Sequence, residues 1–363
     1  MEIKPNDNLF LGSGKNFIKG EGTWLGTRLI PYPSVFYGSI CSLMLSLNED
    51  KKEEYIKNNC KKADPRKYLK IGNVYLYNER NKHTYIPVPL DIFIDEDKKG
   101  QCYISELEKV DNNVICSVNI PYLFMCPESS ERADGMFISL NTFYDNYYYN
   151  DDEIDVICSD DIVSNSYKVG IERNKNYTVK EGNLYRIDLT EFKEDENSSW
   201  SYLVEYEIKS NWWSNKENSI KKGYLKLGGE NKVCRYYSKD IDIVSDYSYV
   251  EDEEEYDYVK LILMSPFIKK NDDWKLNIKN VNIIAASVGK SYNVGGFDLE
   301  YMLPKPMRKA LPEGSIYILD VSRLADRTIR SITDYINRSQ IFSQQQKYGF
   351  GKFKIVPFSS NLR

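Results

Sequence analysis

The stretch GSIYILDVSRLADRTIRSITDYINRSQIFSQQQKYGFGKFKIVPF, residues 314–358, decides the fold class of this chain. It begins with GSIYILDV, which is rich in β-branched and aromatic residues and predicts a strand. Leu324, Ile332 and Ile336 then recur at multiples of four with Ile329 beside them, which predicts a helix across SRLADRTIRSITDYINRSQ. After a Gly-x-Gly link, KFKIVPF is again extended. Strand, helix, glycine loop and strand form the second half of a ferredoxin-like βαββαβ unit.

The N-terminal part of the chain has a related order of elements. An extended segment around NLFLG, residues 8–12, leads through a glycine-rich connection to PYPSVFYGSICSLMLSL, residues 31–47. Prolines just ahead of this apolar run predict a helix start, with Ser34 as a candidate cap. LKIGNVYLYNER and HTYIPVPLDIFID, residues 69–80 and 83–95, flank a polar turn and predict a β-hairpin. The predicted order is therefore β-α-β-β, most of a first ferredoxin-like unit.

The sequence thus predicts an α+β protein with two ferredoxin-like domains, long glycine-rich loops and inserted hairpins. A length of 363 residues exceeds what one core normally spans. Apolar periodicity lapses in the acidic, tyrosine-rich stretch of residues 145–161. We therefore expect one domain over 1–155 and another over 156–363.

Composition favours a globular, soluble, cytoplasmic protein. Hydrophobic residues make up 41% of the chain and aromatic residues 13%, which is ample material for a core. The sequence has neither a signal-peptide pattern nor an apolar run long enough to span a membrane. Its seven cysteines form no CxxC pair, which indicates reduced and mostly buried thiols.

Charge is distributed unevenly along the chain. The formal net charge is −5, which argues against a protein that coats nucleic acid indiscriminately. Residues 302–363 nevertheless hold eleven Lys and Arg against four acids, a charge of +7, so the other residues sum to −12. The C-terminal part is therefore the better candidate for contact with an anion.

Most familiar catalytic chemistry is missing from the sequence. VNIIAASVGKSYN ends in Gly289-Lys290-Ser291 like a phosphate loop, but the position that needs a glycine five residues earlier is Ile284. The only histidine is His83, so a multi-histidine metal site is excluded. Its place between Lys82 and Thr84 in the predicted hairpin turn argues against Ser-His-Asp and Cys-His sites. Acid-base work or metal binding by carboxylates alone stays open. We predict no cofactor, no metal and no catalytic residue.

Four loops combine glycine or proline with cations, at residues 12–19, 289–296, 305–309 and 349–352. Glycines let a main chain approach phosphates, and nearby Lys and Arg attract them. Four aromatic residues near these loops could stack on bases, namely Tyr37, Tyr292, Phe297 and Phe350. The loops favour a protein that binds a phosphate backbone, and the alternative is a set of tight turns with solvated cations.

Several blocks of sequence together resemble the RAMP superfamily. They include LIPYPSVFYGSI, VGIERNKNYTVKEGNLYRI, LKLGGENK, LILMSPFIKKNDDW, VGGFDLEYMLPKPMRKALPEGSIYIL and YGFGKFKIV, and they span nearly the whole chain. Within the superfamily they are most similar to the third subunit of the type III-B CRISPR effector, the Cmr complex. The most specific blocks keep several residue types at fixed spacing, in residues 170–185 and from Gly295 through the PKP and PEGSIY segments.

The resemblance implies two RRM-like domains that cap the end of a ribonucleoprotein. By this resemblance the subunit holds the repeat-derived 5′ handle of the crRNA, lies beside the large polymerase-like subunit and the first backbone subunit, and cuts nothing itself. Where the family usually has an arginine and then an Asp-Gly-Arg-Pro run, this chain has residues 12–16, GSGKN, of which only Lys15 keeps a cation. The candidate RNA-binding residues are Lys15, Ser34, Tyr37, Arg173, Lys290, Ser291, Lys305, Arg308, Lys309, Gly349, Gly351 and Lys352.

Two other functions are compatible with the sequence. One is a RAMP endoribonuclease that processes crRNA precursors, which with a single histidine would need tyrosine, serine or lysine chemistry, for example from Tyr292. The other is a protein-interaction module that works through the acidic loops and touches no RNA.

Overall fold

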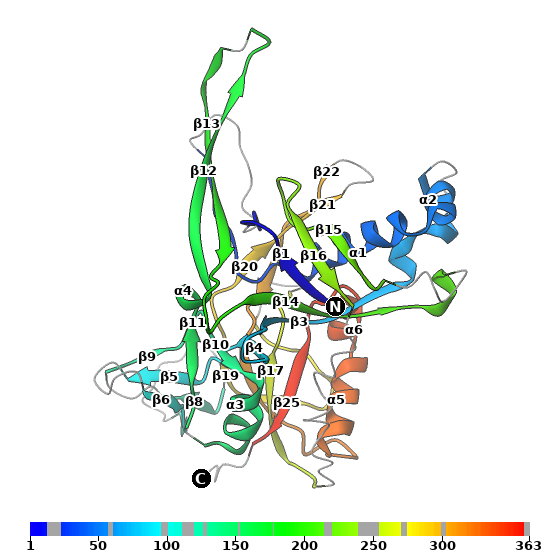
Figure 1. Ribbon diagram of the computed structural model, residues 1–363. Coiled ribbons are helices and arrows are strands. Elements are labelled where there is room, and N and C mark those ends of the chain that lie inside the picture. Colours follow the sequence, from blue (N-terminus) through cyan, green and yellow to red (C-terminus); the bar gives the residue numbers. More distant parts are fainter. Residues whose placement is uncertain are drawn as a thin grey trace. The chain divides into compact units, whose positions relative to one another are not determined.

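The computed structural model describes residues 1–12, 23–56, 61–95, 101–110, 120–125, 129–151, 153–176, 178–213, 220–238, 254–269, 274–298 and 303–358 (Figure 1). The chain is of the α+β class, with several antiparallel sheets and few helices. This confirms the predicted class.

The chain divides into two compact units, each made of three separate segments. Unit 1 contains 1–82, 159–240 and 293–308, and unit 2 contains 83–158, 241–292 and 309–363. The expected domains, 1–155 and 156–363, each contribute segments to both units. One exchange between units, at residues 158 and 159, lies in the stretch where the sequence predicts a boundary.

Unit 1 has a ferredoxin-like sheet. Its strands lie in the order β3-β14-β1-β16-β15, and each neighbouring pair is antiparallel. Taken along the chain, β1, β3, β14 and β16 are the first to fourth strands, so their spatial order is second, third, first, fourth, as in a split βαβ fold. The helix α1 connects the first strand to the second and packs on one face, where the rings of Phe36 and Tyr202 meet edge to face at 5.4 Å. The elements of unit 1 are β1 (Glu2–Pro5), β2 (Thr23–Leu25), α1 (Pro33–Ser46), α2 (Glu49–Ile56), η1 (Lys61–Ala63), η2 (Pro65–Lys67), β3 (Leu69–Asn78), α4 (Ser159–Ile162), β12 (Val163–Arg173), β13 (Val179–Phe192), β14 (Trp200–Ile208), η4 (Ser210–Trp212), β15 (Lys222–Lys226), β16 (Val233–Tyr237), β21 (Phe297–Asp298) and β22 (Leu303–Pro304).

Two details of unit 1 differ from the sequence predictions. The first strand is β1, and in the predicted segment 8–12 only Leu9 and Gly12 form isolated bridges. The helix α1 begins with Tyr32 as its cap and Pro33 in the first turn, so Ser34 lies inside the helix and does not cap it. Proline sets the helical φ at that position and needs no amide partner, so this start requires no side-chain cap.

Unit 2 has a second sheet with the same spatial order, β19-β24-β17-β25, and again every neighbouring pair is antiparallel. The helices α5 and α6 connect the third strand to the fourth. Its elements are β4 (His83–Pro87), β5 (Ile92–Asp95), β6 (Gln101–Ile104), β7 (Leu107–Lys109), β8 (Tyr122–Phe124), β9 (Ser130–Arg132), β10 (Met136–Ser139), α3 (Leu140–Asp145), η3 (Tyr147–Tyr149), β11 (Val156–Cys158), β17 (Tyr258–Leu263), β18 (Phe267–Ile268), β19 (Asn282–Ser287), β24 (Ile316–Asp320), α5 (Ile329–Arg338), α6 (Gln340–Gln346) and β25 (Phe353–Pro357). Two short strands, β20 (Tyr292–Val294) and β23 (Arg308–Leu311), begin in one unit and end in the other.

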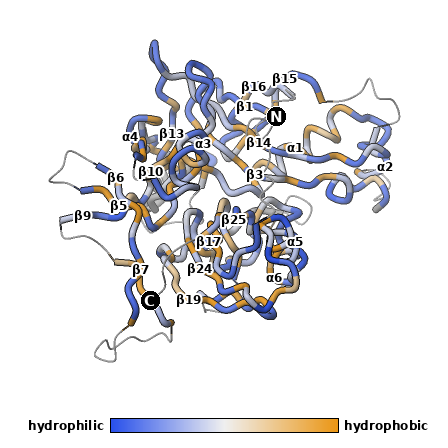
Figure 2. The backbone as a smooth tube through the Cα atoms, turned by 90° about the horizontal axis from the view of Figure 1, so that it is seen from below, coloured by the Kyte–Doolittle hydropathy of each residue, from blue (hydrophilic) through white to orange (hydrophobic). Residues whose placement is uncertain are grey.

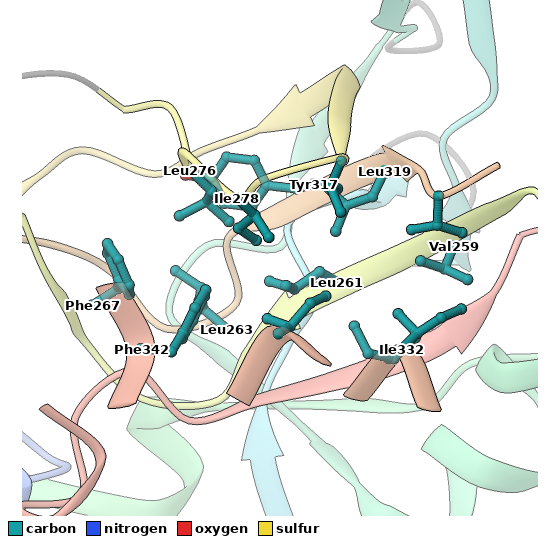
Figure 3. Close-up of a cluster of buried hydrophobic side chains, with 14 of the residues drawn as sticks. Val259, Leu261, Leu263, Phe267, Leu276, Ile278, Tyr317, Leu319, Ile332 and Phe342 are labelled. Carbon is teal, nitrogen blue, oxygen red and sulfur yellow. The ribbon is translucent and has the colours of Figure 1, made fainter. Parts of the chain in front are cut away.

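The core of unit 2 lies between this sheet and its two helices. Alternate residues of β17, Val259, Leu261 and Leu263, point into it together with Ile332 of α5 and Phe342 of α6 (Figure 3). Along α5 and α6 hydrophobic and hydrophilic residues alternate, as expected for helices that bury one face (Figure 2). The helix predicted for residues 322–340 starts only at Ile329, because the Thr328 side chain accepts a hydrogen bond from the Ser331 amide and caps it.

The other face of the unit 2 sheet is closed by the chain itself. Lys260 lies between Val259 and Leu261 on β17, so it points away from the core, and it is 3% exposed. Its Nζ lies 2.6 Å from Asp91 Oδ2 and 3.0 Å from the hydroxyl of Tyr147, which itself donates to Asp91. Burial and the charge of Asp91 raise the pKa of Tyr147 well above its ordinary value, so the hydroxyl keeps its proton. The face that many RRM-like sheets offer to RNA is therefore occupied in unit 2.

Candidate nucleic-acid interface

The ferredoxin-like topology gathers three connections at one end of the unit 2 sheet, and each includes part of a loop predicted from the sequence. Because β19 runs parallel to β17 while β24 and β25 run antiparallel to it, the connections after β19, before β24 and before β25 all meet at the C-terminal end of β17. Hydrogen bonds hold them there: Gly314 N–H donates to Leu263 at 2.7 Å and Met264 N–H to Lys352 at 2.8 Å. We call these connections, residues 289–291, 309–314 and 347–352, the loop end of unit 2.

Gly349 and Gly351 set the backbone conformation of the connection before β25, residues 347–352. Their φ angles are +81° and +63°, values that favour glycine, and both residues are buried. The amide of Gly351 donates to the carbonyl of Pro266 at 2.9 Å, and that of Lys352 to Ser265 Oγ at 2.9 Å. A Cβ on Gly351 would meet the Gln345 side chain at 3.0 Å. These glycines therefore make a tight internal turn, and the cation at its exit, Lys352, is partly exposed.

The other two connections present exposed polar and cationic side chains. Lys290 and Ser291 follow β19 and are exposed, as is Lys309. Main-chain pairing with β18 fixes the position of Lys309, because its carbonyl accepts from the Lys269 amide at 2.9 Å. Tyr292 donates to Glu313 Oε2 at 2.6 Å, so its hydroxyl is engaged within unit 2.

Lys305 and Arg308 belong to unit 1 and follow the two-stranded β21–β22 ribbon. The Lys305 amide donates to the Gly296 carbonyl at 2.8 Å, next to the pairing of Phe297 with Pro304. Both side chains are exposed, and neither forms an ion pair with a residue that the structure describes. Their charges are therefore available to an anionic partner.

Other sequence-predicted residues lie elsewhere or outside the description. Tyr37 is 6% exposed within α1, and its hydroxyl donates to the Arg66 carbonyl at 2.9 Å, so its ring cannot stack on a base. Ser34 is half-buried in the first turn of the same helix. Phe350 is 5% exposed. Lys15, the side chain of Arg173 and that of Phe297 lie outside the described residues, although the main chain of Arg173 pairs with Val179.

Lys347 and Tyr348 were missed by sequence reasoning. They directly precede Gly349 at the loop end, where the Lys347 Nζ lies 5.9 Å from the centre of the Tyr348 ring and Tyr348 is 41% exposed. The signal was present in the sequence as a cation and an aromatic residue next to the glycine loop. Lys347 and Tyr348 place a side chain that can bind a phosphate next to one that can stack on a base.

Among the described residues, no group of three or more His, Cys, Asp or Glu is arranged to hold a metal ion. In the same part of the chain, every helix is too short or too polar to cross a membrane. The four described cysteines are free thiols, and three of them, Cys41, Cys102 and Cys234, are buried.

Comparisons with known proteins agree with this architecture. A chain in the cryo-EM structure of the Type III-B Cmr-beta bound to cognate target RNA is 18% identical, with a TM-score of 0.51 over 97% of this chain and 95% of that chain. A chain in the structure of Type III-B Cmr-beta bound to cognate target RNA and AMPPnP, state 1, is 19% identical, with a TM-score of 0.50 and the same coverage. These two likenesses show a shared fold. A search of curated proteins found no match.

The family comparison is more specific. The model described as CRISPR-associated protein (Cas_Cmr3) matches residues 1–357, nearly the whole chain. The match confirms the resemblance carried by the sequence blocks. The chain therefore belongs to the Cmr3 family of CRISPR-associated proteins, RAMP-type subunits of the type III-B Cmr effector.

Proposed function

We propose that this chain is the non-catalytic subunit that holds the repeat-derived 5′ handle of the crRNA in a cytoplasmic type III-B Cmr effector. The observation that carries the proposal is the loop end of unit 2, where the topology gathers three cation-bearing connections at the same end of one sheet. Family membership supports a role in a CRISPR effector. The chains of similar fold come from a Cmr assembly bound to cognate target RNA, which supports RNA and other Cmr subunits as partners.

The side chains of the loop end suit the backbone of a short single strand. Lys290, Lys309 and Lys352 would neutralise phosphates, and Ser291 could donate a hydrogen bond to one. The buried glycines keep the loop in shape, so their role in the proposal is to position Lys352. Tyr348 offers a partly exposed ring on which a handle base could rest. In such an assembly base pairing with the guide reads the target, while protein holds the guide backbone.

In this proposal the chain caps the assembly beside the large polymerase-like subunit and a backbone subunit, and leaves cleavage to other subunits. With His83 as the only histidine and the Tyr292 hydroxyl bound to Glu313, a general base for RNA cleavage would have to come from another group. The purified protein should leave repeat RNA intact in the presence of a chelator. Metal-independent cleavage that disappears in Tyr292→Phe would instead establish the endoribonuclease.

The proposal is tested by changing the three cations of the loop end that would neutralise phosphates, Lys290, Lys309 and Lys352, together to Ala. The complex is purified from cells that co-express the neighbouring genes, and the RNA that comes with it is sequenced and quantified at several salt concentrations. We expect less RNA with the repeat-derived 5′ end, and a salt dependence shallower by about 0.7 for each phosphate that is no longer neutralised.

A matched control changes three exposed lysines of unit 1 outside the loops, Lys52, Lys62 and Lys67, to Ala. It removes the same charge and should retain the RNA. Equal retention by the two variants would show that the loop end of unit 2 does not hold the RNA.

A further inference from the structure

Unit 1 carries a second surface with the chemistry of a nucleic-acid site, at the edge of its sheet. The strands β15 and β16 pair in register, so that Lys222 lies opposite Tyr237, Tyr224 opposite Arg235 and Lys226 opposite Val233. Alternate residues of a strand point to the same side, so all six side chains share one face. We call them the β15–β16 face, and β15 is the outermost strand of the sheet (Figure 1).

The two sides of this hairpin differ sharply in burial. The residues between the six, Leu225, Cys234 and Tyr236, are 5%, 0% and 3% exposed and pack on the side of α1. On the β15–β16 face, Tyr224 is 65% exposed and Tyr237 is 39% exposed. Two large exposed aromatic side chains that are neighbours on one strand pair form a contiguous candidate surface for a partner.

Within the part of the chain that the structure describes, no acid neutralises the cations of this face. Lys222 and Arg235 form no ion pair with any described residue, and Lys226 donates only to the amide oxygen of Asn231, at 3.2 Å. Residues 220–238 contain five Lys and Arg and a single acid. That acid, Glu230, is already bound to Lys168 at 2.6 Å.

On the inner side of the face the described acids are also engaged. Glu2, opposite Tyr237 in the sheet, is buried and accepts a hydrogen bond from Ser201 Oγ at 3.1 Å. Lys4 of β1 is the partner of Arg235 in the sheet, and its amino group is held by Glu79 and Glu194. Among the described residues the face therefore presents positive charge that no acid compensates, beside exposed aromatic rings.

We infer that the β15–β16 face binds single-stranded RNA without sequence preference. Tyr224 and Tyr237 are diagonal neighbours, about 7–8 Å apart in an antiparallel pair, so each can take one base of the same strand. Lys222 and Arg235 occupy the other diagonal, where they can reach the phosphates between those bases. Protein interfaces are depleted in Lys at their centres, so two lysines among six side chains favour RNA over a protein partner.

This second RNA surface does not depend on the proposed handle site, because it lies on other strands and uses none of the loop residues. A handle is a fixed repeat sequence, whereas stacking on tyrosine and attraction to phosphate accept any bases. The ligand of the β15–β16 face is therefore an unstructured RNA segment of arbitrary sequence.

The test measures fluorescence anisotropy of a uridine 12-mer, which lacks any repeat sequence, with the purified full chain. Tyr224→Ala and Tyr237→Ala should each weaken binding about tenfold, the effect of losing one base–aromatic stack. Lys222→Gln with Arg235→Gln should also weaken binding and make its salt dependence shallower by about 0.7 for each phosphate that these side chains no longer neutralise. Since all four side chains are exposed, the melting temperature should not change.

Two matched controls change exposed residues elsewhere. Tyr149→Ala removes a tyrosine that is also 65% exposed, and Lys52→Gln with Lys67→Gln removes two exposed cations of unit 1. Both should bind the 12-mer like the wild type. Failure of the wild type to bind it, or equal binding by all variants, overturns the inference. If the Tyr224 and Tyr237 variants bind RNA normally but lose Cmr subunits on co-purification, the face is a protein interface instead.

Discussion

Lys4 is the residue that most clearly links charge to stability in unit 1. Its Nζ lies 2.9 Å from Glu79 Oε2 and 2.6 Å from Ser199 Oγ. Partial burial alone would raise the pKa of Glu79, but hydrogen bonds with Glu2, Lys4 and Ser199 and the charge of Lys4 lower it to about 2. The ionised carboxylate is therefore favoured by the folded state.

This cluster predicts a definite pH dependence for Glu79→Gln. A depressed folded pKa stabilises the protein above the ordinary value of 4.5, and the stabilisation is lost as pH falls from there to about 2. Because the site is partly solvated, we expect the variant to be less stable by about 1 kcal/mol at pH 7. Urea unfolding of both proteins from pH 7 to pH 2 should show this difference shrinking toward zero. A difference that stays constant over this range, or equals that of the exposed Glu196→Gln, would contradict the assignment.

At the scale of elements, the turn before β25 depends on Gly351, which is buried and has a positive φ. Gly351→Ala places a Cβ at φ +63° and 3.0 Å from Gln345, so we expect a loss of about 1–2 kcal/mol in the free energy of unfolding. Gly38→Ala is the matched control, because a Cβ added to Gly38 in α1 would meet no other atom within 4 Å. There alanine should be neutral or stabilise the protein by up to about 1 kcal/mol. Thermal unfolding of both variants measures the contrast. An undisturbed Gly351→Ala protein would show that the turn tolerates a side chain.

The elements with a clear period were the predictable ones. The strands β24 and β25 follow from their β-branched and aromatic residues and the helix α5 from the fourfold spacing of apolar residues, and the sequence also indicated α1 and β3. The cap of α5 was missed because the apolar spacing that predicts the helix already begins at Leu324. Thr328 therefore lay inside the predicted helix and not at its start. The burial of Gly349 and Gly351 could not be predicted, because Ser265 and Pro266, which hold this turn, are more than eighty residues away in sequence. The β15–β16 face was missed because Lys and Tyr at every second position of a short strand are also typical of an ordinary solvated sheet edge.

At the scale of the whole molecule, a buried ion pair joins two distant segments of unit 2. Lys260 comes from the segment 241–292, whereas Asp91 and Tyr147 come from 83–158. Lys260→Met leaves the carboxylate of Asp91 buried without its cation, so we expect a loss of about 3–5 kcal/mol in the free energy of unfolding. Tyr147→Phe, which removes only a hydroxyl, should cost about 1–3 kcal/mol.

Equilibrium unfolding in urea checks both values, with Lys52→Met as an exposed control that should change stability by less than about 0.5 kcal/mol. If Lys260→Met were no more costly than this control, the ion pair would not hold the segments together. Sequence reasoning could not find this ion pair. A lysine inside the apolar strand YVKLIL looks like a solvated position until the segment that covers it is known.

The division of each unit into three segments also has a consequence for synthesis of the protein. The chain passes between the units five times, and unit 1 is complete only when residues 293–308 have been made. The sheet of unit 2 still lacks β24 and β25 at that point. Unlike consecutive domains, which fold one after the other, the two units therefore both stay incomplete until most of the chain has been made. A nascent chain stopped after residue 155 should expose unpaired strands from both units and depend on chaperones until the later segments arrive.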